Sequence, residues 1–272
     1  MPYKNLVTQT CWVFCLFFLL GCARNPYYSS NRSYKKQANT YAKILATYPL
    51  ADSFATANEW VGTTNFNLRK PNFVIIHHTD QESCAQTLQT FTLTRTQVSA
   101  HYVICKDGTV YHMLNDYFRA WHAGVSKWGN LTDVNSASIG IELDNNGESI
   151  FPDSQIQSLL KLLTALKEAY HIPAANFIGH ADVAPERKVD PSRFFPWKLL
   201  AEKGFGYWYD TSNVIVPASF NALQALRIIG YNIKDSSAAI RSFKIHFTPA
   251  DSTEQLNAAD QKILFSLQQK YE

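Results

Sequence analysis

The chain lacks the features of nucleic-acid-binding, disordered and repeat proteins. Its 272 residues carry 25 basic and 22 acidic side chains, with no lysine and arginine block long enough to follow a phosphate backbone. Only 17% of residues are charged, whereas 46% are apolar and 14% aromatic, so global disorder is excluded. Eleven glycines and eleven prolines without a period, and the lack of an internal repeat, exclude collagen-like and solenoid folds. One or two globular domains are expected.

A long apolar run is also lacking. The stretch Cys11–Leu20, which follows Lys4, is shorter than the ~20 residues that a membrane-spanning helix needs. It is typical of a signal-peptide core. The stretch runs into Leu19-Leu20-Gly21-Cys22, which resembles a bacterial lipobox. Residues 1–22 are therefore predicted to be a lipoprotein signal peptide, with an ordinary cleaved signal or an uncleaved anchor as the alternatives.

Cysteine is scarce, and most of the five cysteines are accounted for by this signal. Cys11 and Cys15 leave with it, and Cys22 becomes the lipidated N-terminus. Acyl chains contribute about 0.8 kcal/mol per buried methylene, so they would hold the protein on a bilayer. Only Cys84 and Cys105 remain in the folded part, either as a disulfide or as two separately buried thiols.

The residue after the lipidation site indicates a location. Ala23 stands where an aspartate would retain a lipoprotein at the inner membrane, so a lipid-anchored protein facing the periplasm, at the outer membrane, is expected. Residues 23–50 are polar and Tyr-rich and are predicted to be a tether, with a short helix near Tyr41–Ala46. Residues 51–210 and 211–272 are predicted to form two further domains.

Strands and helices alternate in the larger domain, which predicts an α/β fold with a mixed central sheet flanked by helices. A helix is expected through Leu88 and Phe91, and another over 154–170 behind a Ser154/Gln157 capping pair. The predicted strands lie at 73–76, in a hairpin at 101–105 and 110–114, at 138–143 and at 177–180.

Ionisable residues gather where apolar strands end. His77 follows the first strand, and His180 and Asp190 belong to a proline-rich loop after the last one. Two histidines and a carboxylate suit a catalytic zinc site, which takes three protein ligands and keeps one position open for water. Glu142, at the end of its own strand, is placed to accept a proton from that water, and Lys188 could stabilise an oxyanion.

Taken singly, each of these residues also has an ordinary explanation. A histidine at a strand end is more often a surface or core residue than a ligand, and a carboxylate is more often solvated or ion-paired. The recurrence of the pattern at three strand ends favours a site, since α/β folds place their sites there.

Five motifs give this pattern a family resemblance. In order they are Ile76–Thr79, Ser99–Tyr102, Trp121–Gly124, Ser138–Glu142 and His180–Pro191. Over roughly residues 55 to 210 they resemble the type 2 N-acetylmuramoyl-L-alanine amidases, a zinc family related to peptidoglycan recognition proteins. The last motif, with Lys and Asp eight and ten residues after His, is highly specific.

The resemblance implies roles for the matched residues. His77, His180 and Asp190 would bind zinc, and Glu142 and Lys188 would be catalytic. The implied reaction is hydrolysis of the amide bond between N-acetylmuramic acid and L-alanine in peptidoglycan or muropeptides. A non-catalytic peptidoglycan receptor and a zinc peptidase acting on the stem peptide are the alternatives, and no protein partner is implied.

The remaining histidines and tryptophans are assigned by position. His78 should point away from His77 on the strand. His101, His122 and Trp121 fall in family motifs and are predicted to support the ligands or to line the cleft. The other residues are expected to be structural or solvated, with a groove role as the alternative for the tryptophans: His112, His171, His246, Trp128 and Trp197.

Residues 211–272 contain three helical patterns. The first, Pro217–Ile229, ends at Gly230; the second carries Ile240, Phe243 and Phe247; the third opens at Ser252. Three short helices resemble the small peptidoglycan-binding module that is attached to wall hydrolases, with the Ile229-Gly230-Tyr231 turn as the best match. A purely structural C-terminal cap is the alternative.

Overall fold

The computed structural model describes residues 25–46, 65 and 67–272, which fall into two compact units, residues 1–62 and residues 63–272. The predicted signal peptide and Cys22 lie outside the described residues. In the first unit the described residues form α1 (Tyr28–Leu45), which has no buried residue. This helix is longer than the short one predicted near Tyr41–Ala46, because the segment has no proline or glycine to interrupt it. No described helix is both long and apolar enough to cross a membrane.

The second unit is built on one mixed sheet, as predicted. Its strands are β1 (Phe73–His78), β2 (Tyr102–Ile104), β3 (Val110–His112), β4 (Ser138–Leu143) and β5 (Phe177–Gly179). Their order across the sheet is β3-β2-β4-β1-β5. Neighbouring strands are parallel except for the β2–β3 hairpin. The carboxyl ends of β1 and β4 therefore lie side by side, which brings their terminal polar residues together.

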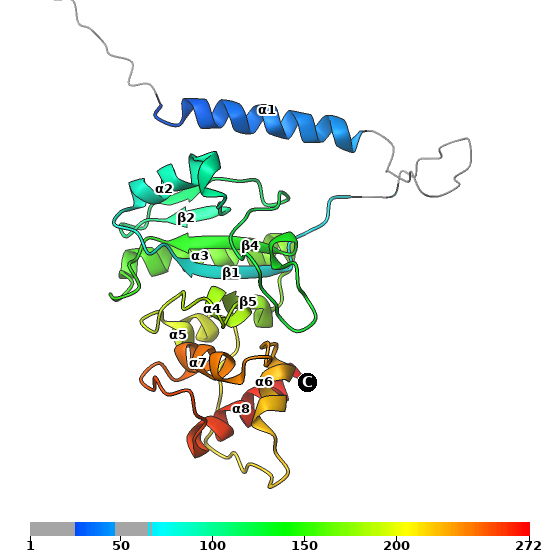
Figure 1. The fold of residues 1–272 in the computed structure, drawn as a ribbon, viewed down its shortest axis with the longest axis vertical. Coiled ribbons are helices and arrows are strands. Elements are labelled where there is room, and N and C mark those ends of the chain that lie inside the picture. Colours follow the sequence, from blue (N-terminus) through cyan, green and yellow to red (C-terminus); the bar gives the residue numbers. More distant parts are fainter. Residues whose placement is uncertain (1–24, 47–64, 66) are drawn as a thin grey trace, which may run out of the picture. The chain divides into compact units, whose positions relative to one another are not determined.

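Helices and short 3-10 turns connect the strands. The turns are η1 (Thr94–Thr96), η2 (Val134–Ser136) and η3 (Ala174–Asn176). The helices are α2 (Cys84–Thr92), α3 (Asp153–Tyr170), α4 (His180–Val183), α5 (Trp197–Glu202), α6 (Ala222–Ile229), α7 (Ser236–Phe247) and α8 (Ala258–Tyr271). Figure 1 shows α6, α7 and α8 grouped beyond β5, the edge strand of the sheet.

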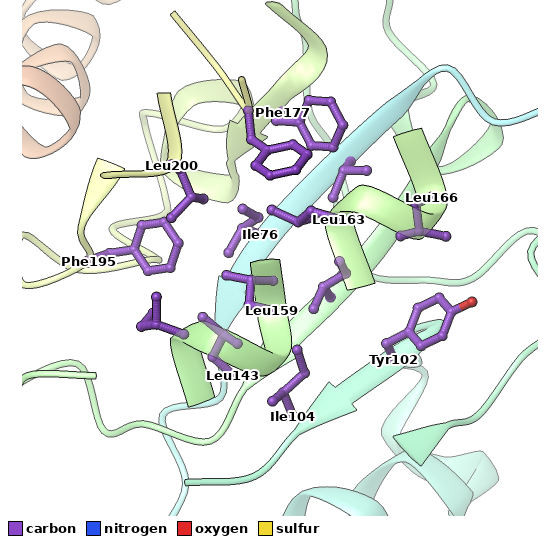
Figure 2. Close-up of a cluster of buried hydrophobic side chains, with 14 of the residues drawn as sticks. Ile76, Tyr102, Ile104, Leu143, Leu159, Leu163, Leu166, Phe177, Phe195 and Leu200 are labelled. Carbon is purple, nitrogen blue, oxygen red and sulfur yellow. The ribbon is translucent and has the colours of Figure 1, made fainter. Parts of the chain in front are cut away.

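Alternate residues of the central strands form an apolar cluster with α3. Val74 and Ile76 of β1 and Ile141 of β4 are fully buried there, against Leu159 and Leu163 of α3 (Figure 2). Because side chains alternate across a strand, the residues between them face the opposite side of the sheet. That side carries Ile75, His77 and Glu142, so α3 supports the sheet without covering the predicted site.

A second apolar cluster joins the sheet to the C-terminal helices. Ile75 of β1, Ile178 of β5 and Val183 of α4 share it with residues of α6, α7 and α8. Helix α7 contacts both α4 and α5. Residues 211–272 therefore share a hydrophobic core with the sheet domain.

Three local predictions are corrected by the structure. Ser154 does not cap α3, since its hydroxyl donates to the Lys106 carbonyl, 2.7 Å away, from inside the helix. Helix α8 begins at Ala258 rather than near Ser252, because Asn257 and Asp260 form a capping box. His180 opens the one-turn helix α4 instead of lying in an irregular loop.

The two cysteines of the folded part form a disulfide. Cys84 at the start of α2 is bonded to Cys105, which follows β2; their Cα atoms are 5.4 Å apart and their sequence separation is 21. The bond fixes α2 to the sheet, and Thr87, Thr90 and Phe91 of this helix line the cleft described below.

Removing this disulfide is expected to destabilise the protein. The Cys84→Ala/Cys105→Ala variant should lose about 3 kcal/mol of unfolding free energy, because closing a loop of this length restricts the unfolded chain. Urea denaturation measures the difference. A reductant should lower the wild-type midpoint toward that of the double variant and leave the double variant unchanged. Equal midpoints for oxidised wild type and double variant would contradict this prediction.

Candidate metal centre and active-site cleft

Two adjacent parallel strands supply the first residues of the site. His77 of β1 lies directly opposite Glu142 of β4 in the strand register. Both side chains point to the face of the sheet that α3 does not cover. The parallel arrangement, rather than sequence proximity, therefore places a ligand-type side chain beside a carboxylate.

The segment after β5 brings two more side chains to His77. His180 begins α4, and the Ala181 N–H donates to the Asp190 carbonyl at 2.7 Å, which folds the loop back onto the helix. His77 Nδ1 and His180 Nδ1 are 2.9 Å apart, and each is 3.0 Å from Asp190 Oδ2. All three residues are buried. One nitrogen from each ring and one carboxylate oxygen thus face a single point.

The far nitrogen of His180 determines which ring nitrogen carries the proton. His180 Nε2 lies 3.1 Å from the Ala123 carbonyl oxygen, which can only accept a hydrogen bond. A ring that donates from Nε2 to this carbonyl has its lone pair on Nδ1, which faces His77 and Asp190.

A chain of hydrogen bonds assigns the proton of His77 in the same way. Ser138 Oγ donates to the Val134 carbonyl at 2.6 Å, so it accepts from His122 Nε2 at 3.2 Å. His122 Nδ1 is then an acceptor for His77 Nε2–H, 3.1 Å away. Burial, followed by the effect of His180, lowers the pKa of His77 to about 4, and burial lowers the pKa of His122 well below its usual range. Neutral His77 therefore also presents its Nδ1 lone pair.

These assignments leave three lone-pair donors facing one another with no proton between them. Such an arrangement repels itself unless a cation lies among the donors. Two imidazole nitrogens and one carboxylate oxygen are the donor types that a transition-metal ion accepts. His77, His180 and Asp190 are accordingly a group that could hold a metal ion.

The predicted catalytic residues lie in the same cleft as this group. A cavity of 420 Å³ is lined by His77, His180 and Asp190 together with Glu142 and Lys188. Glu142 Oε2 is buried and has no hydrogen-bond partner among the described residues. Burial and the Asp190 carboxylate raise the pKa of Glu142 well above its usual range, whereas the Lys188 charge lowers it. The cleft therefore contains an unsatisfied carboxylate with raised basicity beside the donor group.

The residues predicted to support the site fall into two groups. His122 hydrogen-bonds to His77, and Trp121, half of whose surface is exposed, lines the cleft with it. His101 is outside the cleft: it is fully buried, its Nε2 donates to the Phe118 carbonyl, and its Nδ1 accepts from the Gly140 N–H. His78 accepts a hydrogen bond from the Ser192 N–H and borders the cleft without joining the donor group.

The two other tryptophans are buried in apolar surroundings. Trp128 packs against Tyr231, and Trp197 stacks on His246. Of the remaining histidines, His112 pairs with Asp116 near the surface. Trp128 and Trp197 therefore belong to the core rather than to a saccharide groove.

Sequence reasoning missed the residues that hold the loop around His122. Asn135 Oδ1 accepts the N–H groups of His122 and Ala123, at 3.2 and 2.8 Å. Arg187 donates to the carbonyls of Ala123 and Val125. Arg187 lies in the specific motif at 180–191, and this position could have identified it from the sequence. Asn135 lies outside every motif, so no sequence signal identified it.

Position 140 of β4, two residues before Glu142, has no room for a side chain. A Cβ atom at this position would lie 2.4 Å from Cγ of the His122 ring, so the ring needs the bare backbone of the strand. The ring rests there to bond both Ser138 and His77.

Comparison with known proteins gives a consistent family match. A family model described as N-acetylmuramoyl-L-alanine amidase matches residues 67–193. The chain is 32% identical over 230 residues to the N-acetylmuramoyl-L-alanine amidase AmiD of Escherichia coli strain K12, covering 73% of this chain and 82% of AmiD. It is 42% identical over 101 residues to the 1,6-anhydro-N-acetylmuramyl-L-alanine amidase AmpD of the same strain, covering 37% of this chain and 55% of AmpD.

Solved structures agree. The complex of E. coli AmiD with its substrate anhydro-N-acetylmuramic acid-L-Ala-D-gamma-Glu-L-Lys matches with a TM-score of 0.67 at 30% identity, covering 77% of this chain and 93% of that one. AmpDh3 of Pseudomonas aeruginosa, in complex with anhydromuramic pentapeptide, matches with a TM-score of 0.67 at 28% identity, covering 80% and 99%. The predicted mixed-sheet fold is therefore confirmed.

The contact between Gly140 and His122 is expected to control metal affinity. In Gly140→Ala the new methyl should displace the His122 ring, remove the acceptor for His77 Nε2–H, and weaken zinc binding about 10-fold. Overpacking should also cost roughly 1–3 kcal/mol of stability. Competition with a chromophoric chelator measures the affinity.

A double-mutant cycle provides the control. In a His122→Ala background there is no ring to displace, so adding Gly140→Ala should weaken zinc binding by less than 2-fold, a non-additivity expected of residues in contact. An equal effect of Gly140→Ala in both backgrounds would show that the methyl acts in some other way.

Proposed function

Because this chain belongs to the N-acetylmuramoyl-L-alanine amidase family, we propose that it hydrolyses the amide bond between N-acetylmuramic acid and L-alanine in peptidoglycan or muropeptides. The observation that carries the proposal is the placement of Glu142 in one 420 Å³ cleft with His77, His180 and Asp190. A receptor would not need a carboxylate oxygen, Glu142 Oε2, that is buried beside such a donor group with no hydrogen-bond partner among the described residues.

Zinc is the metal that fits the donor group. Two neutral imidazoles and one carboxylate form a three-ligand set of the kind found in catalytic zinc sites, where a fourth position stays open. The far nitrogens of His77 and His180 are both engaged, which fixes the orientation of the rings. Zinc bound by His77, His180 and Asp190 would supply a Lewis acid and lower the pKa of a coordinated water to about 7.

The chain's own residues then provide the acid–base chemistry. Glu142 accepts the proton of the attacking water, a role that suits a carboxylate whose pKa is raised above its usual range. Lys188 places a positive charge in the cleft, where it stabilises the negative charge that develops on the lactyl carbonyl oxygen. Glu142 passes its proton to the nitrogen of L-alanine, so that the amide carbon–nitrogen bond breaks and a carboxylate and an amine are released.

Soluble muropeptides are proposed as substrates in addition to intact peptidoglycan. The AmiD structure holds an anhydro-muramyl tripeptide, and the AmpDh3 structure holds an anhydromuramic pentapeptide. The exposed ring of Trp121 at the edge of the cleft offers an apolar surface to a sugar ring or a stem peptide.

A lipid anchor is proposed for the chain. Gly21-Cys22 ends the lipobox-like sequence, and Ala23 follows it. Acylated Cys22 would tether the enzyme to the periplasmic face of the outer membrane, through residues 23–50, which include α1. The anchor would keep the cleft close to the wall.

The proposed function is tested by mass spectrometry of defined muropeptides incubated with the protein. The expected product is a free peptide that begins with L-alanine. Chelation should abolish its release, and added zinc should restore it. Intact muropeptide that nevertheless binds would support the receptor alternative, and cleavage within the stem would support the peptidase alternative.

In the same assay, Glu142→Gln separates catalysis from metal binding. Because Glu142 is not one of the three donors, the variant should bind zinc like the wild type. It should lose roughly 10²- to 10⁴-fold in kcat, the usual contribution of a general base. Glu168→Gln, on the exposed side of α3, is the matched control and should keep full activity. Full activity of Glu142→Gln with normal zinc content would exclude this mechanism.

The anchor is tested with Cys22→Ser. Without the thiol no acyl chain can be attached, so the variant should move from the membrane fraction to the soluble fraction, with unchanged activity on soluble muropeptides. Fractionation followed by immunoblotting measures the shift. Cys15→Ser, within the signal, is the control and should leave the distribution unchanged. Equal membrane retention of wild type and Cys22→Ser would contradict lipidation at Cys22.

A further inference from the structure

Asp182, two residues after the metal-ligand candidate His180, is the centre of a buried polar network. Its carboxylate accepts three short hydrogen bonds and a longer one, of 3.4 Å, from the Ser242 hydroxyl of α7. The Gly179 N–H donates to Oδ2 at 2.8 Å, His246 Nδ1 lies 2.8 Å from the same oxygen, and the Tyr231 hydroxyl donates to Oδ1 at 2.7 Å. The mechanism proposed above uses none of these groups.

Of these partners, all except Gly179 belong to residues 211–272. Tyr231 lies between α6 and α7, and His246 lies on α7; both are buried. The His246 ring is stacked on Trp197 of α5, with ring centroids 4.0 Å apart and planes 13° apart. Burial and the Asp182 charge raise the pKa of Tyr231 well above its usual range, so its hydroxyl remains a donor.

Asp182 connects this network to the metal centre. It belongs to α4, which spans only His180–Val183 and so has too few internal hydrogen bonds to fix its own direction. The bond from the Gly179 N–H to Asp182 secures the start of the helix, next to His180. The direction of α4, and with it the position of His180 Nδ1, is therefore determined by what holds the Asp182 carboxylate.

The geometry points to Tyr231 and His246 as positioning residues of the metal centre. Acting through Asp182, they hold α4 so that His180 Nδ1 stays 2.9 Å from His77 Nδ1 and 3.0 Å from Asp190 Oδ2. This inference rests on the proposed metal site. It makes residues 211–272 a part of the catalytic unit, because Tyr231 and His246 lie 51 and 66 residues after His180 in sequence and their removal would loosen this ligand.

The test measures zinc affinity in the full chain, by competition with a chromophoric chelator, together with kcat and the melting temperature. Tyr231→Phe removes one oxygen and leaves the ring in place. His246→Leu removes the second donor, whereas His246→Asn keeps an N–H group at the place of Nδ1. Leu267→Val, in the buried core of α8, is a control that loosens the C-terminal helices without touching Asp182.

Tyr231→Phe and His246→Leu are expected to raise the zinc Kd roughly 3- to 10-fold, less than the 10- to 100-fold typical of a direct partner of a ligand. His246→Asn should restore the affinity to within 2-fold of the wild type, and Leu267→Val should lower the melting temperature with an unchanged Kd. If Tyr231→Phe and His246→Leu lower only the melting temperature, the network is purely structural and the inference is wrong. Zinc titration does not depend on which bond the protein cuts. If the protein bound zinc but had no amidase activity, the proposed function would be wrong and the inference about Tyr231 and His246 would be unaffected.

Discussion

The site depends on one electrostatic constraint: three lone-pair donors face one another at about 3 Å with no proton to share. The Nδ1 lone pairs of His77 and His180 and the Asp190 carboxylate repel in this arrangement until a cation lies among them. A protein can hold such a group only if its scaffold resists that repulsion. The parallel pairing of β1 with β4, the folded-back loop between His180 and Asp190, and the buried surroundings of all three residues provide that resistance.

The supports of the two histidines differ in kind. His77 is oriented by a series of hydrogen bonds that runs through the side chains of His122 and Ser138 and ends at the Val134 carbonyl, close to β4. His180 is oriented by the Ala123 carbonyl on one side and by its short helix on the other. Since the helix cannot orient itself, its stability comes from packing and hydrogen bonding with distant parts of the chain, as is usual for short helices.

Sequence patterns predicted the elements whose signal is local. The apolar run at 73–76, the hairpin around Gly108 and the apolar spacing over 154–170 correspond to β1, β2–β3 and α3. The spacing of His180, Lys188 and Asp190 predicted the residues that the structure brings into one cleft. The pairing of Asp182 with Tyr231 and His246, which are 49 and 64 residues away, could not be predicted, because neither partner has a local pattern that distinguishes it from an ordinary core residue. The α4 turn was missed for a related reason, since one turn leaves no periodicity.

The Ile229-Gly230-Tyr231 turn, which best matched a peptidoglycan-binding module, makes contacts with other parts of the same chain. A Cβ atom at Gly230, whose φ is +136°, would lie 2.3 Å from the Trp128 ring, so the glycine lets that ring pack against the turn. The Gly230 carbonyl accepts the Gly129 N–H at 2.7 Å, and Tyr231 reaches Asp182. These residues serve contacts between α6 and the sheet domain and are not available to a glycan. Wall binding by residues 211–272 stays a prediction, and it would have to use a surface other than the turn that suggested it.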